Sequence, residues 1–172
     1  RLLAHQNRRR LPAESIRDAL LVAAGKLDGA PATSAVSHLG EQAIRNAANN
    51  GGSAQMEEHR KRSIYLPLVR NDMPPFLETF DMANPDVATG LRNVTTVPAQ
   101  ALLMLNSGFV KEMAEAVAVR AAEEAGDDRG KMVAALYRRI LNRAPSASEI
   151  MRGEAGVDEL TASVDAIVAG FT

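Results

Sequence analysis

The chain has 172 residues and a net charge of -1, with 20 Lys and Arg against 21 Asp and Glu. Hydrophobic residues make up 46% of it and charged residues 24%, which is typical of a folded globular domain and excludes a disordered chain. Cysteine is absent, which excludes disulfides, thiolate metal sites, a Cys nucleophile and haem attached through cysteine within this chain. Apolar runs stay far below the roughly 20 residues of a membrane-spanning helix, so we expect no membrane segment.

The charges are divided unevenly along the chain. Residues 1–70 contain 11 basic and 6 acidic side chains, whereas residues 71–172 contain 9 basic and 15 acidic ones. The two parts should therefore attract each other. Nucleic-acid-binding domains usually have a clear basic excess, which the whole chain lacks, so nucleic acid is not the expected partner. Binding through the basic clusters at residues 8–10 and 60–62 is kept as a second alternative function.

The first predicted element is a helix over residues 12–24. Apolar residues recur at helical spacing from Ile16 to Leu27, Pro12 suits the first turn and Gly25 suits the C-cap. Residues 28–52 are rich in Gly, Ala, Ser and Asn and are expected to be loop, with room for a short helix at 39–48.

An extended segment or short β element is predicted around residues 63–69. Ile64, Leu66 and Leu68 alternate with other residues, and Pro67 restricts any strand to a sheet edge. A short apolar turn at 76–80 and an irregular stretch at 81–90 should follow.

The second half is predicted to be helical. A Thr cap followed by Pro98 begins one helix, Ser107 caps the next, a third covers 129–141, and the Ser146–Glu149 capping box begins a fourth segment, with a weaker helix at 160–167. The expected fold is therefore mainly α, an irregular helical domain with one extended segment. We expect a single helical domain over residues 1–152 and a divergent tail helix over 153–172.

The sequence lacks the common catalytic patterns. The three histidines form neither an i, i+4 pair nor an HExxH motif, so no metal site is predicted. Neither a Gly-x-Ser-x-Gly turn nor a glycine-rich phosphate loop is present. Catalytic residues are therefore not identified, and the sequence favours a chain that is not an enzyme by itself.

One group of polar residues lies in or beside apolar segments. Charged side chains near a core are usually paired, because an unpaired buried charge is costly. The group is a polar network that holds the extended segment on the helices, or else a cleft in which arginines bind an anion or a sugar. Its members are Arg62, Tyr65, Arg70, Asp81, Arg92, Thr95, Gln100 and Asn106. An alternative function is a polysaccharide hydrolase or lyase that uses Tyr65, Asp81 and the nearby arginines.

Four segments together resemble a bacterial family. They are RRLPAESIRDALL at 9–21, RSIYLP at 62–67 with Phe80 and Asp81, RNVTTVPAQAL at 92–102 with Leu105 and Asn106, and YRRILNRAP at 137–145 with Glu149. In this order they resemble the C-terminal domain of unknown function of the planctomycete-type multidomain cytochrome c proteins. The resemblance covers roughly residues 7–150, and departs from the family pattern at 29–32 and beyond 152, so we expect a fragment of a longer protein.

The resemblance implies an exported protein, periplasmic or at the cell surface. Members are large, and some include carbohydrate-binding inserts. It implies no activity and no cofactor for this chain, since any haem would belong to an N-terminal module that is absent here. The expected function is a non-catalytic scaffold, docking or ligand-binding module in a cytochrome c-type or polysaccharide-handling protein. Its expected partners are other domains of the same protein, with an anionic polysaccharide as a further candidate.

Overall fold

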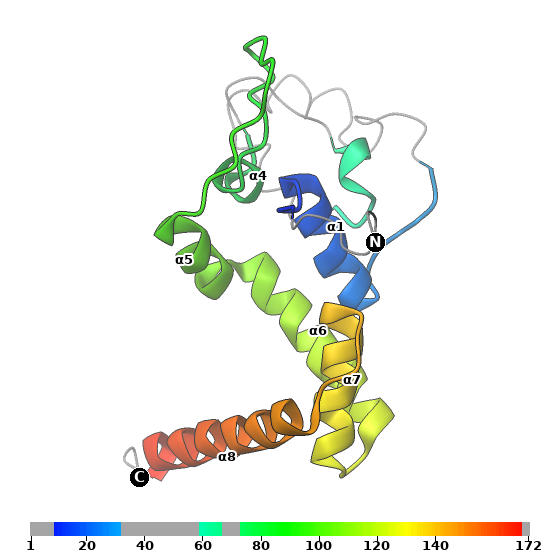
Figure 1. Cartoon of the computed structure of the whole chain (residues 1–172), viewed down its shortest axis with the longest axis vertical. Helices are drawn as coiled ribbons and strands as arrows, with labels where there is room; N and C mark the ends of the chain where they lie inside the picture. Colours follow the sequence, from blue (N-terminus) through cyan, green and yellow to red (C-terminus); the bar gives the residue numbers. More distant parts are fainter. Residues whose placement is uncertain (1–8, 32–58, 67–72, 170–172) are drawn as a thin grey trace, which may run out of the picture. The chain divides into compact units, whose positions relative to one another are not determined.

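The computed structural model describes residues 9–31, 59–66 and 73–169, with side chains as far as residue 160. The chain forms two compact units, residues 1–113 and residues 114–172, which are described separately below. Helices dominate, and the only β pairing among the described residues is an isolated bridge between Asp28 and Lys61 (Figure 1). The prediction of a mainly α fold is confirmed. None of the described helices is both long and apolar enough to span a membrane.

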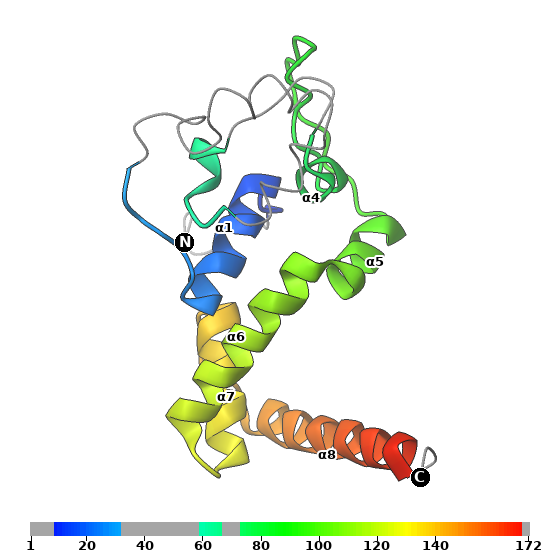
Figure 2. The same ribbon diagram turned by 180° about the vertical axis from the view of Figure 1, so that it is seen from behind.

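Helix α1 (Ala13–Ala24) begins after Pro12 and ends at Gly25, whose positive φ of 66° suits glycine. Both ends agree with the sequence prediction. The buried row, however, consists of Ala13, Arg17, Leu21 and Ala24, and includes a charged residue where the apolar pattern predicted only aliphatic ones. The buried row differs from the predicted apolar stripe because a 3-10 helix, η1 (Ser63–Tyr65), and helix α4 (Pro75–Thr79) flank α1, as Figures 1 and 2 show.

The predicted extended segment is different in the structure. Residues Ser63–Tyr65 form a 3-10 helix, η1, and only Leu66 after it is extended. The Ser63 backbone N–H and hydroxyl both donate to Asp18 Oδ1, at 2.8 and 2.6 Å. These bonds turn the chain toward α1, which a straight strand would not allow. Residues 67–69, and the short helix considered at 39–48, lie outside the described residues.

Helix α4 (Pro75–Thr79) stands where a short apolar turn was predicted. Its Phe76 and Leu77 are buried, and the Phe76 ring packs edge-on against Phe109 with ring centroids 5.9 Å apart. Helix α5 (Pro98–Asn106) follows and contacts α4. Its N-cap is Val97 rather than a threonine.

Helix α6 (Gly108–Ala125) contains the division between the two units. The second unit continues with α7 (Arg129–Leu141), capped by the Asp128 side chain and ended by Asn142 in the left-handed conformation, and with α8 (Ala147–Ala169). The Ser146–Glu149 capping box is present. Helix α8 continues through residue 152 without a break, so the segment predicted to begin at the capping box and the helix predicted at 160–167 are one helix. The division into a domain at 1–152 and a tail at 153–172 stays a prediction.

Candidate functional site

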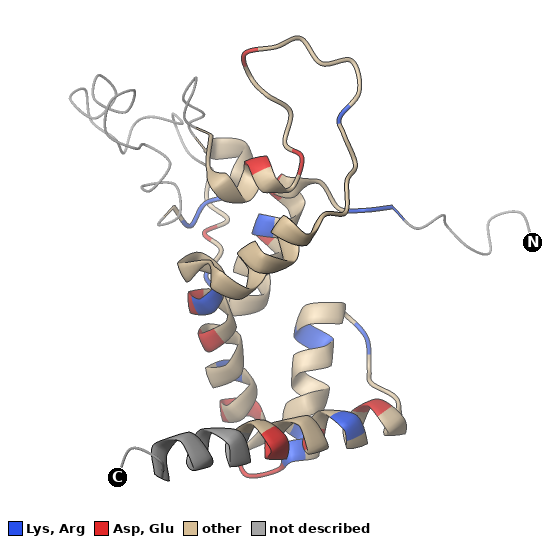
Figure 3. Ribbon diagram, turned by 90° about the vertical axis from the view of Figure 1, so that its left-hand side faces the viewer, with Lys and Arg blue, Asp and Glu red and all other residues tan. Residues whose placement is uncertain are grey.

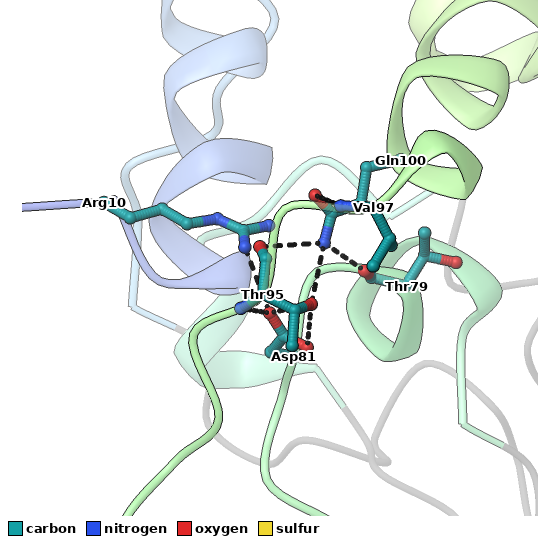
Figure 4. A network of polar contacts seen from close by, with 6 residues as sticks. All are labelled: Arg10, Thr79, Asp81, Thr95, Val97 and Gln100. Carbon is teal, nitrogen blue, oxygen red and sulfur yellow. Dashed lines mark hydrogen bonds and ion pairs between the residues drawn. The ribbon is translucent and has the colours of Figure 1, made fainter.

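The candidate site of the first unit is built at the base of a long loop, residues 82–94. Asp81 follows α4 with a φ of 64°, a conformation that turns the chain out into the loop. Thr95, at the other end of the loop, donates its backbone N–H to Asp81 Oδ2 at 2.8 Å and its hydroxyl at 2.9 Å. Arg10 Nη1 donates to the same oxygen at 3.1 Å. Figure 4 shows these groups converging on the carboxylate.

Gln100, on the first turn of α5, completes this network. Its Nε2 donates to the carbonyls of Thr79, at 3.0 Å, and Thr95, at 3.3 Å. Its Oε1 accepts from the Val97 backbone N–H at 3.4 Å. The side chain is buried, so these bonds occupy polar atoms that water could not otherwise reach. Gln100 therefore joins the end of α4 and the base of the loop to the start of α5.

The network also sets the charge state of Asp81. The pKa of this carboxyl lies below its ordinary value, chiefly because the Thr95 backbone N–H donates to it. The Thr95 hydroxyl and Arg10 lower the pKa further, whereas partial desolvation raises it. The carboxylate is consequently ionised at neutral pH. It accepts hydrogen bonds there and lacks the raised pKa of a general acid.

A second polar cluster surrounds Arg17, which is not among the site residues predicted from the sequence. Its guanidinium is buried and donates to the carbonyl oxygens of His59 and Lys61 and to Ser63 Oγ. Burial lowers its pKa to about 10, so it still carries a positive charge at neutral pH. The guanidinium also lies over the Phe109 ring, 5.6 Å from the centroid. Arg17 thus attaches residues 59–63 to α1.

Arg62 and Arg92 line one open depression of about 410 Å³. Arg92 Nη1 donates to both Glu14 oxygens, at 2.8 and 2.9 Å. Arg62 has a looser partner, with Nε 4.0 Å from Asp18 Oδ2. A second depression of about 370 Å³ adjoins it and shares Pro12 and Arg92.

The structure brings together only some of the predicted site residues. Asp81, Thr95 and Gln100 form the loop network, and Arg62 and Arg92 share a depression. Tyr65 is half-buried in η1 and lines neither depression. Asn106 is exposed and donates to the Leu102 carbonyl of its own helix. Arg70 lies outside the described residues.

Arg10, Glu14, Arg17 and Asp18 were missed as site residues. All four lie in the segment at 9–21 on which the family resemblance rests, and that resemblance could have identified them as candidates. Their partners are far away in sequence, so pairing could not be read from spacing. Among the side chains that the structure describes, no group of three or more His, Asp or Glu is placed to hold a metal ion.

Comparison with known proteins places the chain in a family and gives no further relative. Curated proteins include no match, and solved structures include none either. Residues 1–156 match the PSD1 family, described as a protein of unknown function (DUF1553). The match extends through both polar clusters and both depressions and covers most of the chain, in agreement with the family resemblance in the sequence. The chain therefore belongs to the DUF1553 family.

Proposed function

We propose that this chain is a non-catalytic scaffold and docking domain of an exported, multidomain protein of the cytochrome c or polysaccharide-handling type. Its partners would be the other domains of that protein, in the periplasm or at the cell surface. The proposal rests on the hydrogen bonds that the candidate site residues make with one another and on the exposed apolar side chains near them. Asp81, Thr95 and Gln100 bind one another and hold a loop, while large apolar side chains nearby are left exposed.

The geometry supports docking over catalysis. An Asp81 acid or base would need to reach a substrate proton, but its oxygens accept hydrogen bonds from Thr95 and Arg10. Tyr65, the other catalytic candidate, does not line the depression that contains Asp81. The arrangement therefore supports a structural role for these residues.

Three residues of the basic clusters are also paired with carboxylates of the chain itself. Arg10 pairs with Asp81, and Arg60 Nη2 lies 2.8 Å from Glu112 Oε1. Lys61 pairs with Asp28. Phosphate binding would have to displace these partners, which favours docking over the nucleic-acid alternative.

Docking is supported by the exposed apolar side chains of the first unit. Contiguous apolar surface on a folded domain usually marks an interaction site, whereas single exposed residues are ordinary. Eight large aliphatic side chains in the described part of this unit are more than half exposed, namely Leu11, Val22, Ile64, Val87, Leu91, Val94, Leu102 and Leu105. Figure 3 shows that the loop which carries three of them is mostly uncharged.

The proposal is tested by association. The chain and the remaining domains of its parent protein are produced separately, mixed at about 100 μM and examined by sedimentation velocity. We expect a complex whose affinity falls at least about tenfold in a variant with Leu91→Ser and Leu105→Ser, because both side chains would be buried in the interface. Val119→Ser, at an exposed position of α6 in the second unit, is the matched control.

Two results would contradict docking. One is the absence of any complex at this concentration. The other is turnover of an acidic polysaccharide by the purified chain that Arg62→Ala abolishes, which would revive the enzymatic alternative.

A further inference from the structure

We infer that the two adjoining depressions of the first unit form one surface that binds an extended, acidic and leucine-rich peptide segment of a partner protein. The inference rests on the proposed docking function and specifies its partner. The two depressions share Pro12 and Arg92, so a single ligand can occupy both.

The first depression supplies apolar contacts. Leu11, Phe80, Leu91 and Val94 lie on its wall, and Leu91 is 88% exposed. Covering solvent-exposed aliphatic side chains with apolar groups of a ligand is favourable, because it removes apolar surface from water. An anionic polysaccharide lacks such alkyl groups, whereas leucine side chains in a peptide supply them.

The second depression supplies positive charge. The side chains of Arg62 and Arg92 are 62% and 48% exposed, while the lining carboxylates of Asp18 and Glu14 are only 22% and 25% exposed. Those carboxylates already accept hydrogen bonds, Asp18 from Ser63 and Glu14 from Arg92. Because Arg92 is itself paired with Glu14, the charge that faces a ligand is mainly the guanidinium of Arg62, whose Nε lies 4.0 Å from Asp18 Oδ2. A guanidinium group binds carboxylates in bidentate geometry.

The backbone of the loop favours an extended peptide. Within the described part of the chain, the main-chain groups of Gly90, Leu91, Asn93 and Val94 make no hydrogen bond. A peptide laid along this segment can pair with such free N–H and carbonyl groups, as in β-strand addition. Backbone pairing, apolar contacts and carboxylate binding together specify a peptide and not an isolated anion.

The test uses the whole chain and a fluorescein-labelled peptide of alternating Leu and Glu, with fluorescence anisotropy as the readout. We expect a dissociation constant in the micromolar range, weakened as salt screens the charges. An alternating Leu and Lys peptide should bind at least about tenfold more weakly, because its ammonium groups face the two arginines.

Single substitutions locate the surface. Arg62→Gln and Leu91→Ser should each weaken binding of the Leu and Glu peptide about threefold or more. Lys111→Gln and Leu160→Ser, which remove an exposed cation and an exposed leucine outside both depressions, should leave it unchanged. Thermal melts of all four variants establish that each is folded.

Three outcomes would overturn the inference. These are equal binding of the Lys peptide, equal binding by the Arg62 and Leu91 variants, or equally tight binding of an oligosaccharide of uronic acids. If the peptide fails but the chain still associates with the other domains of its parent protein, docking stands and only the peptide surface is wrong. If neither binds, both proposals fall.

Discussion

Asp81 shows how one residue can determine the course of a loop. A non-glycine residue at φ 64° is disfavoured by contact between its Cβ and the following carbonyl, although Asp tolerates this conformation better than most residues. The Thr95 and Arg10 donors compensate by binding its carboxylate. Asp81 and Thr95 belong to one predicted polar group because both flank apolar segments. Arg10 was assigned to a basic cluster instead, since its partner is 71 positions away.

Replacing Asp81 tests this role at the residue scale. Asp81→Asn keeps a side chain that tolerates the left-handed conformation but loses the charge that binds Arg10. We expect a lower Tm at pH 7 and faster tryptic cleavage after Arg92 in the loop. Because the folded pKa of Asp81 is depressed, its stabilisation is present above the ordinary Asp pKa of about 4 and is lost as the pH falls through the folded value.

The Tm difference between the wild type and Asp81→Asn should accordingly shrink as the pH falls below about 4. Glu78→Gln, which neutralises an exposed carboxylate on α4, should show neither effect. An unchanged Tm together with an unchanged cleavage rate in Asp81→Asn would show that the network does not hold the loop.

At the scale of the elements, α7 and α8 pack closely because of one glycine. A Cβ built on Gly153 of α8 would lie 2.8 and 2.9 Å from the two Cγ atoms of Val133 on α7. Such a short separation requires the Val133 side chain or one of the helices to shift. Gly156, one turn further along α8, has no atom within 4 Å of the corresponding position. The helices themselves were predictable from caps and periodicity, but this contact was not.

Gly153→Ala should therefore destabilise the second unit by about 1–3 kcal/mol through overpacking. Gly156→Ala, the matched control, should stabilise it by up to about 1 kcal/mol, since alanine is the better helix former and has room. Urea denaturation followed by helical circular dichroism measures both values. Stabilisation by Gly153→Ala would show that α7 and α8 do not pack this closely.

At the scale of the whole molecule, the uneven charge along the sequence has a structural counterpart. Within the first unit, Arg10 pairs with Asp81, and Lys26 and Arg60 both pair with Glu112, so basic residues of the first part meet acidic residues of the second. In the pair of Glu14 and Arg92, the acidic residue comes from the first part of the sequence and the basic residue from the second. Charge counting predicted the attraction, while the individual partners depend on how α1, α4 and α6 are placed.

The division into two units predicts separate responses to core mutations. Leu77 is fully buried in α4, and Leu77→Ala should cost about 2–5 kcal/mol. Hydrogen exchange should therefore accelerate in α1 and α4 while α7 changes little. Val133→Ala, in the core of the second unit, should give the reverse pattern. Equal acceleration in α1 and α7 for both variants would mean that the chain unfolds as one cooperative unit.

The sequence by itself determined most of the helices, because their signals are local. Pro12 and Gly25 bound α1, Asp128 caps α7, and Ser146 with Glu149 begins α8, each within a few residues of the helix it sets. The tertiary structure alone decided that residues 63–65 turn instead of extending, that Arg17 is buried, and that Arg10 joins Asp81. Each of these depends on hydrogen-bond partners more than forty positions away, and periodicity contains no information about such distant pairs.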